Sequence, residues 1–304
     1  RSSADASWRS PRSISRRPRP ERSPALESAG FHHPLVRAAK SLHQKKHRLE
    51  QRCFLVEGPT AVETALDASG VEIERVFVDA DATTPTTIAA KAAARSVDLI
   101  AVDERTMRSL SETRTPQGVV AVARFFHKEP ARLPDLAGDG SQPSTVLVLH
   151  DVGDPGNAGT LFRSAEAFGA AAVCCSTGGV DPYNEKVARA SLGSMFHVPL
   201  VLYGRWAELA EGLRAARLAV VAADAGAPDV RTVTLPKNVA LVVGNERRGV
   251  ASLPADAVAV RIGIPQSART ESLNAAVAGS IALYEIARAN GTLPTSRAAR
   301  TSDA

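Results

Sequence analysis

Two polar residues whose types could take part in chemistry, an asparagine and an arginine, stand six positions apart in the second half of the chain. Asn157 and Arg163 lie in the segment 150–165, which follows a short apolar run. On a helix, six residues turn through roughly 600°, so the two side chains point about 120° apart. Both can face one cleft if Asn157 begins the helix, and an arginine there would stabilise an oxyanion. The alternative is a helix cap at Asn157 and a surface arginine.

A glycine and a carboxylate follow the apolar run 239–243. Gly244 stands where this run ends, and Glu246 is two residues further on. A glycine at the carboxyl end of a strand lets a ligand approach the backbone closely. The carboxylate of Glu246 then lies at the edge where parallel sheets bind ligands. The alternative is a turn with a surface salt bridge.

Two more polar residues stand at the start of the helix predicted over 271–289, whose part 275–289 is apolar. Ser272 and Asn274 stand at its start, and Ile264-Pro265 ends the preceding strand because proline lacks the ladder donor. The helix is apolar nearly all round, which is typical of a buried helix. Buried polar groups need hydrogen-bond partners. The alternative is that both residues cap the helix.

The elements that position these loops indicate an α/β domain. Apolar runs typical of strands covered on both faces recur at 145–149, 171–175, 218–222, 239–243 and 258–262, and helical patterns separate them at 158–168, 185–192, 206–216 and 271–289. This alternation predicts a mostly parallel sheet with helices on both faces. A dinucleotide-binding enzyme on such a sheet is a weak alternative, because the glycine spacing is not G-x-G-x-x-G.

A smaller α/β segment precedes this domain. Helices are predicted at 34–51, 60–68, 84–94 and 104–110, and strands at 53–56, 75–78, 98–102 and 119–125. The stretch 127–144 has many glycine and proline breakers and no periodicity, which predicts a linker. The predicted order is a disordered basic tail (1–30), a smaller α/β domain (31–126), the linker (127–144), the larger domain (145–290) and a disordered tail (291–304).

Composition limits the class of protein. The chain has 304 residues, 44% of them hydrophobic, but no apolar run reaches the ~18–20 residues of a membrane span. The arginine-rich amino end has no apolar region of a secretory signal. Three cysteines without a C-x-x-C pair argue against a disulfide scaffold and a zinc site. We therefore expect a cytoplasmic protein without a membrane or metal partner.

The positive charge is concentrated at the amino end. Residues 1–30 hold seven arginines against three acidic residues, for a net charge of +4, and residues 31–52 add +5. The whole chain has a net charge of +5, so the remaining residues sum to −4. Basic terminal segments often bind nucleic acid. The alternative for residues 1–30 is a solvated, inert tail.

Taken in order, the three loops resemble a known family. The stretches N-A-G-T-L-F-R-S-A, V-V-G-N-E-R-R-G and I-P-Q-S-A-R-T-E-S-L-N are similar to the three motifs of the SpoU/TrmH family of RNA 2′-O-ribose methyltransferases. The resemblance covers about 144–290. The first segment, with F-L-V-E-G and T-P-Q-G-V-V-A-V, resembles the substrate-binding domain that often precedes it.

This resemblance implies a fold and a set of site residues. The family threads its carboxyl-terminal domain as a trefoil knot and builds its active site across a homodimer. By motif, Gly244, Ile264 and Leu273 would contact S-adenosylmethionine, mainly through the backbone. The polar site would comprise Asn157, Arg163, Glu246, Ser272 and Asn274.

The segment 181–191 resembles the part of the family in which basic residues face RNA. Lys186 and Arg189 are three residues apart, so they share one face of a helix. The alternative is an ordinary solvated helix face.

The implied reaction suits these residue types. Methyl transfer from a sulfonium is an in-line displacement that depends on positioning and needs no metal. Arg163 would stabilise the ribose alkoxide and grip the adjacent phosphate, and the proton acceptor stays unassigned. The expected substrate is ribosomal RNA, with transfer RNA as the alternative substrate. An inactive RNA-binding protein of the same fold is the non-enzymatic alternative, and the methylated nucleotide cannot be named.

Overall fold

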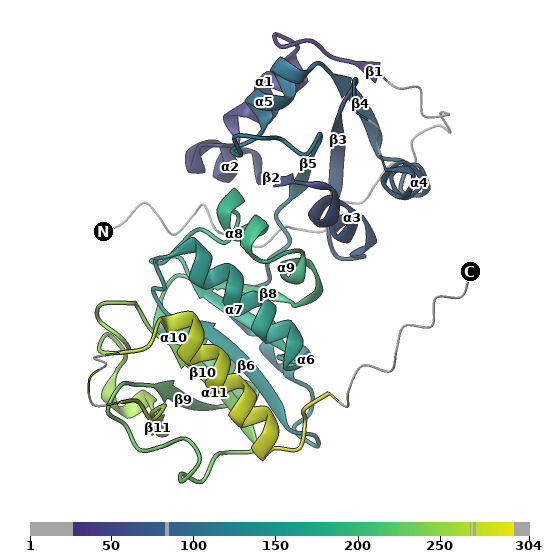
Figure 1. Ribbon diagram of the computed structural model, residues 1–304. Helices are drawn as coiled ribbons and strands as arrows, with labels where there is room; N and C mark the ends of the chain where they lie inside the picture. Colours follow the sequence, from purple (N-terminus) through teal and green to yellow (C-terminus); the bar gives the residue numbers. More distant parts are fainter. Residues whose placement is uncertain (1–26, 83–84, 268, 270–271, 295–304) are drawn as a thin grey trace. The chain divides into compact units, whose positions relative to one another are not determined.

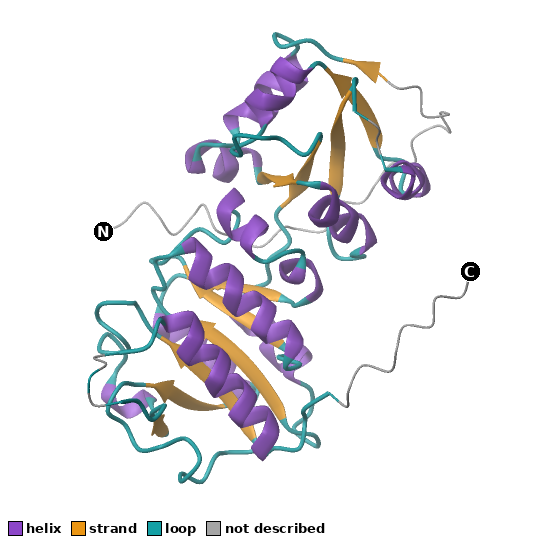
Figure 2. Cartoon of the chain, in the orientation of Figure 1, coloured by secondary structure: helices purple, strands orange, loops and turns teal. Residues whose placement is uncertain are grey.

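The computed structural model describes residues 27–82, 85–267, 269 and 272–294. Contacts between residues divide the chain into two compact units. Unit 1 comprises the chain up to residue 128 together with residues 180–197, and unit 2 comprises residues 129–179 and the chain from residue 198 onward. Each unit contains one sheet flanked by helices (Figures 1 and 2).

Unit 1 is built on a five-stranded sheet in the order β1-β4-β3-β5-β2. Its strands are β1 (Glu27–Ser28), β2 (Cys53–Glu57), β3 (Ile73–Asp79), β4 (Asp98–Val102) and β5 (Val119–Arg124). Its helices are α1 (Pro34–Ser41), α2 (Lys45–Gln51), α3 (Pro59–Asp67), α4 (Thr86–Ala94), α5 (Glu104–Leu110), α8 (Glu185–Ala190) and α9 (Ser194–His197). Strand β5 runs antiparallel to both β2 and β3, whereas the pairs that β4 makes with β1 and β3 are parallel. The sheet is therefore mixed.

Unit 2 is built on a six-stranded sheet in the order β11-β9-β10-β6-β7-β8, in which every described pair is parallel. Its strands are β6 (Ser144–Leu149), β7 (Ala172–Ser176), β8 (Leu200–Tyr203), β9 (Ala219–Ala223), β10 (Asn238–Val243) and β11 (Val260–Ile262). Its helices are η1 (Pro130–Arg132), α6 (Leu133–Ala137), α7 (Pro155–Ala167), α10 (Trp206–Ala215), η2 (Ala255–Ala257) and α11 (Ala275–Ala289). The predicted parallel α/β domain is confirmed.

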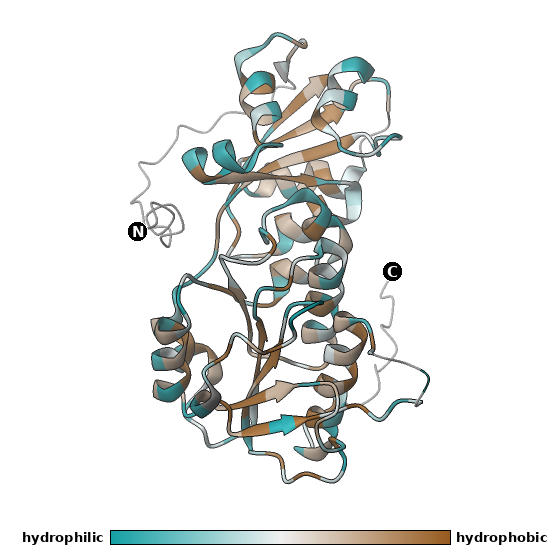
Figure 3. Cartoon of the chain, turned by 90° about the vertical axis from the view of Figure 1, so that its left-hand side faces the viewer, coloured by the Kyte–Doolittle hydropathy of each residue, from teal (hydrophilic) through white to brown (hydrophobic). Residues whose placement is uncertain are grey.

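Helices cover both faces of this parallel sheet. Helices α7 and α11 run side by side over one face (Figure 1). Helices α6 and α10 pack against the other face. The buried core on this face includes Val146, Val148 and Leu209. Gly279 allows α11 to lie close to its neighbours, because a Cβ at this position would come within 2.7 Å of the Leu161 side chain. The strands carry mostly hydrophobic residues (Figure 3), as a sheet covered on both faces requires.

Two predicted boundaries are wrong because short segments belong to the folded units. Glu27 and Ser28, which we assigned to the tail, pair with β4, and Ala29 behind them is buried. Within the predicted linker 127–144, helix α6 buries Leu133 completely in the core of unit 2. The remaining residues of the two predicted tails, 1–26 and 295–304, lie outside the described residues.

The predicted helix 34–51 is interrupted at residues 42–44, and a buried arginine explains the break. Arg48 donates from Nη1 to the carbonyls of Leu42 (2.8 Å) and His43 (2.9 Å). Its Nη2 also forms an ion pair with Asp181 at 2.6 Å. The side chain of Arg48 is only 4% exposed, so this residue of the basic segment is not available to bind RNA.

Residues 180–197, which we placed within the larger domain, pack instead as part of unit 1. The fully buried ring of Tyr183 stacks on Phe125 with the centroids 3.9 Å apart. Its hydroxyl accepts hydrogen bonds from the backbone N–H groups of Phe126 and His127, both at 2.9 Å. Aromatic packing of this kind adds to the stabilisation from burial alone. The predicted single domain over 145–290 is therefore interrupted, because residues 180–197 within it pack with unit 1.

Two features bear on the class of protein. Cys53, Cys174 and Cys175 are buried and form no disulfide with one another, and the last two lie in β7 as predicted. Among the described helices, none combines the length and apolar character that crossing a membrane requires.

Candidate active site

A pocket opens at the carboxyl edge of β9, β10 and β11 in unit 2. It is an open pocket with about 620 Å³ of empty space, open solvent at its mouth included. Its lining comes from the ends of the three strands and the loops that follow them: Ala223, Asp224, Ala225, Val243, Gly244, Asn245, Glu246, Ile262, Ile264, Gln266, Ser272, Leu273, Ala275 and Ala278. Parallel strands bring their carboxyl ends to one edge, and ligands of such sheets bind there.

The three predicted cofactor-binding residues, Gly244, Ile264 and Leu273, all line this pocket. Gly244 tolerates no side chain, because a Cβ would meet the carbonyl oxygen of Gly249 at 2.1 Å. This close approach follows from the turn 245–249, in which Asn245 N donates to Gly249 O at 3.1 Å and Gly249 N donates to Asn245 O at 2.7 Å. The glycine therefore lets the loop fold back against the end of β10.

Three of the five predicted polar residues form one hydrogen-bonded chain. Asn157 donates from Nδ2 to Glu246 Oε1 at 2.9 Å. Its Oδ1 accepts from Asn274 Nδ2, also at 2.9 Å. Glu246 lines the pocket, so the loops that follow β6, β10 and β11 are joined at its wall.

Asn157 is not the cap of α7, which corrects the simpler interpretation of this residue. Asp154 caps the helix and accepts from Asn157 N at 2.7 Å. Helix α7 begins at Pro155, three residues before the predicted start, so Asn157 lies in its first turn. Its buried side-chain amide is thereby left to bridge Glu246 and Asn274.

Asn274 serves both of the functions that we considered for it. Its Oδ1 accepts from Ala276 N at 2.9 Å and Val277 N at 3.2 Å, which caps α11 at residue 275 rather than 271. Its Nδ2 remains free to donate to Asn157. Ser272 is exposed and lines the pocket, and it is not the cap.

The Glu246 carboxylate is held in its charged form. Burial works against the charge, but hydrogen bonds from Asn157 Nδ2, Gly153 N (3.0 Å) and Asp154 N (3.1 Å) outweigh it and lower the pKa of Glu246. Donors aimed at a carboxylate favour its ionised state. Glu246 therefore presents a fixed negative charge at the pocket wall.

Arg163 lies outside the pocket. It is exposed on α7, and within the described part of the chain no hydrogen bond or ion pair involves it. The structure of one chain therefore does not bring Arg163 together with the other predicted site residues. Its guanidinium stays available to a ligand or a second molecule.

Lys186 and Arg189, the predicted RNA-binding residues, lie on α8 in unit 1. Lys186 is exposed. Arg189 is half-buried and forms ion pairs with Glu57 at 3.3 Å and Glu112 at 3.8 Å. The alternative that Lys186 and Arg189 lie on an ordinary solvated helix face is therefore wrong for Arg189, because its guanidinium is paired with carboxylates of unit 1.

Two pocket residues were missed from the sequence. Asp224 follows β9 directly, and its Oδ2 accepts from Arg261 at 2.7 Å. An acidic residue at the end of a predicted strand was a signal that could have found it. Gln266 has a buried Oε1 without a hydrogen-bond partner among the described residues. Nothing in the sequence indicates that this oxygen is buried.

Comparisons with known proteins match both parts of the chain. Residues 144–284 match the model of the SpoU rRNA Methylase family. Residues 33–121 match the model of the MRM3-like substrate binding domain. The order of these two regions is the one that the sequence predicts.

Relatives and solved structures agree with these matches. The 23S rRNA (guanosine(2553)-2′-O)-methyltransferase RlmP of Bacillus subtilis is 32% identical over 255 residues, which cover 83% of this chain and 95% of that protein. The 23S rRNA (guanosine-2′-O-)-methyltransferase RlmB of Nitrosomonas europaea is 32% identical over 194 residues, covering 64% and 74%. The crystal structure of an AdoMet-bound rRNA methyltransferase from Sinorhizobium meliloti has a TM-score of 0.76 at 31% identity, covering 87% and 98%.

Proposed function

The chain belongs to the SpoU/TrmH family of RNA methyltransferases, and from that premise we propose that it methylates a ribose 2′-hydroxyl of ribosomal RNA with S-adenosylmethionine. The observation that carries this proposal is the chain of hydrogen bonds from Asn274 through Asn157 to Glu246 at the wall of the pocket. The relatives named above act on 23S rRNA, which favours ribosomal over transfer RNA.

The pocket suits S-adenosylmethionine in its chemistry. Val243, Ile264 and Leu273 supply apolar surface for an adenine ring, and Asp224 and Gln266 supply acceptors. The buried Gln266 Oε1 has no partner among the described residues, and the amino groups and hydroxyls of the cofactor are donors that could satisfy it. S-adenosylmethionine, when bound, supplies a methyl group already activated on a sulfonium.

The residues of the chain then position the ribose 2′-hydroxyl and stabilise the negative charge that develops on its oxygen. The ribose oxygen becomes nucleophilic as its proton leaves, and a nearby cation lowers the cost of that charge. Arg163 is our candidate for this role and for holding the adjacent phosphate. Glu246 is fixed by three donors, so it is suited to orienting groups at the pocket rather than to moving.

We propose that the active unit is a homodimer. Val277, Ile281 and Tyr284 are exposed on one face of α11 at 46%, 36% and 41%. Such a contiguous apolar face is typical of an interface. Helix α7, which carries Arg163, packs beside α11, so a second copy seated on this face would lie next to the helix of Arg163.

Two further features belong to the same proposal and rest on the family resemblance. We propose that the loops after β10 and β11 are threaded as the trefoil knot of the family. We also propose that the protein acts in the cytoplasm.

The decisive test uses RNA from a strain in which the gene is deleted. Mapping of 2′-O-methyl groups in its ribosomal RNA against the parent strain should show the loss of one modification. Purified protein should then transfer tritium from labelled S-adenosylmethionine to the unmodified RNA. Loss of a methyl group from transfer RNA alone would identify the other substrate, and no transfer to either RNA would favour an inactive RNA-binding protein.

A further inference from the structure

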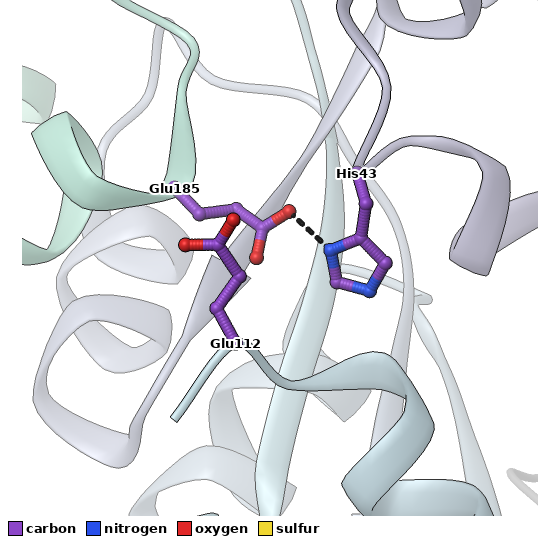
Figure 4. Close-up of side chains that lie close together, drawn as sticks. All are labelled: His43, Glu112 and Glu185. Carbon is purple, nitrogen blue, oxygen red and sulfur yellow. Dashed lines mark hydrogen bonds and ion pairs between the residues drawn. The ribbon is translucent and has the colours of Figure 1, made fainter. Parts of the chain in front are cut away.

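Three side chains that can ligate a metal converge in unit 1 and take no part in the pocket of unit 2. His43 lies in the turn between α1 and α2, Glu112 follows α5, and Glu185 is the first residue of α8. Their candidate ligand atoms all lie within 4.8 Å of one another. Figure 4 shows the three side chains close together, with the Glu185 carboxylate joined to the imidazole ring of His43 and the Glu112 carboxylate beside it.

Glu185 carries an oxygen that the described structure leaves without a partner. The residue is only 3% exposed. Its Oε1 lies 2.7 Å from His43 Nδ1, whereas its Oε2 has no hydrogen-bond partner among the described residues. A buried carboxylate oxygen without a donor carries a large desolvation penalty. Glu112 adds a second carboxylate to the centre, and it also lies 3.8 Å from Arg189 Nη2, so the unpartnered oxygen of Glu185 is the group that favours a cation here.

The ring of His43 is oriented as a metal-ligating histidine is. Its Nε2 lies 3.2 Å from the carbonyl oxygen of Ser109. A carbonyl only accepts, so Nε2 carries a proton and Nδ1 points toward the carboxylates. Histidine ligands usually donate their second N–H to a carbonyl or carboxylate in this way.

We propose that His43 Nδ1, Glu112 and Glu185 bind one divalent cation of the zinc class. Imidazole nitrogen and carboxylate oxygen are ligands that Zn²⁺ accepts at about 2.0–2.2 Å, and a water would complete the shell. The Glu112 side chain is exposed, and its carboxylate would have to move inward to bind the ion. The cation would neutralise both carboxylates and satisfy the orphan oxygen of Glu185.

A proton on Nδ1 is the competing occupant of the same position. Hydrogen bonding to Glu185 outweighs burial and raises the pKa of His43, with Glu112 and the Ser109 carbonyl adding to the effect. A proton, however, serves only Oε1 of Glu185 and leaves Oε2 unpaired. The metal must displace this proton from Nδ1 in order to bind.

The consequence of this site is structural. A cation held by these three ligands would tie α8, and with it residues 180–197, to the turn between α1 and α2. The methyl transfer proposed above needs no metal, so the two proposals fail independently of each other. The three ligands are widely separated in the sequence, which is why no short sequence motif indicates the site.

Titration of the full-length, EDTA-treated protein with Zn²⁺ tests this proposal. Isothermal calorimetry at mildly alkaline pH should show one ion per chain, and Zn²⁺ should raise the melting temperature. Glu185→Gln and His43→Gln should each weaken Zn²⁺ binding by at least ~10-fold and remove the thermal shift. His47→Ala is the matched control, because His47 lies on α2 and pairs with Glu50 at 3.0 Å, and it should leave binding intact.

Co²⁺ in place of Zn²⁺ keeps the test decisive if a variant folds poorly. Wild-type protein should develop the visible absorption of Co²⁺ bound by nitrogen and oxygen ligands, and Zn²⁺ should bleach it. Absence of Zn²⁺ binding by the wild-type protein would overturn the proposal. So would binding that both ligand variants retain.

Discussion

Asn157 Nδ2 donates to Glu246 Oε1 at 2.9 Å across 89 residues of sequence. This bond connects the first turn of α7, the helix that follows β6, with the loop after β10. Strands β6 and β10 are neighbours in the parallel sheet of unit 2. Asn157 also accepts from Asn274, and only an amide side chain of this length both donates and accepts here. The geometry of the proposed active site therefore depends on one buried amide and one carboxylate.

Glu246→Gln should reduce the acid sensitivity of the fold. The pKa of Glu246 lies below its ordinary value of 4.5, because hydrogen bonds outweigh the opposing effect of burial. A carboxyl group with a lowered folded-state pKa stabilises the protein above the pKa of the unfolded chain, and this stabilisation disappears as the pH falls through the folded-state pKa. The free energy of unfolding should therefore fall more steeply in the wild type than in the variant below about pH 4.5.

Urea denaturation at a series of pH values measures this difference. Glu211→Gln changes an exposed glutamate of α10 and serves as the control. Parallel pH profiles for wild type and Glu246→Gln would show that the hydrogen bonds to Glu246 contribute nothing to its ionisation.

Arg163→Ala should lower the rate of methyl transfer by ~10²-fold or more, because the developing alkoxide then has no cation beside it. Binding of S-adenosylmethionine should be unchanged, since Arg163 lies outside the pocket. Single-turnover transfer of labelled methyl groups and calorimetric titration of the cofactor give the two readouts. Arg214→Ala, on the exposed side of α10, should leave both unchanged. Near-normal turnover by Arg163→Ala would remove this residue from the mechanism.

Gln266→Leu should weaken the binding of S-adenosylmethionine by about 2- to 10-fold, the worth of one hydrogen bond. The variant also removes a buried oxygen that has no partner among the described residues. The melting temperature of the ligand-free protein should therefore hold or rise while affinity falls. A destabilised variant with unchanged cofactor affinity would show that Gln266 has only a structural role.

Ile281→Asp should convert the homodimer into monomers and abolish methyl transfer. The charge would stand in the middle of the exposed apolar face of α11, between Val277 and Tyr284, where desolvating it is costly. Light scattering with size-exclusion chromatography gives the mass, and circular dichroism checks the fold. Leu192→Asp changes a more exposed apolar residue of unit 1 and should leave the mass unchanged. Wild-type protein that is monomeric and active would contradict the proposed assembly.

The sequence predicts the pocket well because local signals coincide there. Apolar runs mark the strands, and glycine or proline ends them, so the loops that follow are expected at one edge of the sheet. The family motifs then select Gly244, Ile264 and Leu273, which all line the pocket there. Pairs formed between distant segments carry no such signal. The buried pair Arg48–Asp181 spans 133 residues, and neither residue type indicates burial. The same limit explains why residues 180–197 were assigned to the wrong packing unit.

Side-chain direction is the second limit of the sequence. The interpretation of Asn157 as the cap of α7 is wrong because Asp154, three residues earlier, takes that position. Both residue types are good caps, so composition alone does not choose between them. The role of Asn157 follows only from the positions of its two partners, Glu246 and Asn274.

The last prediction concerns the basic amino end. Deletion of residues 1–26, which lie outside the described part of the chain, removes seven arginines and two acidic residues. The cut spares β1, whose Glu27 and Ser28 pair with β4. Affinity for RNA should fall, and the log–log salt dependence should flatten by roughly 0.7–0.9 for each phosphate that the shortened protein no longer binds. Binding of free S-adenosylmethionine should not change.

Exposed basic residues of α1 and α2, such as Arg37 and Lys46, remain in the truncated protein. Buried Arg48 makes no contribution to RNA binding, because Asp181 holds its charge. Turnover at saturating RNA should therefore persist while the RNA concentration needed for half-maximal rate rises. Filter binding of full-length and truncated protein across a salt series measures the effect. Superimposable curves would show that the tail has no part in RNA recognition and that the basic surface of unit 1 suffices.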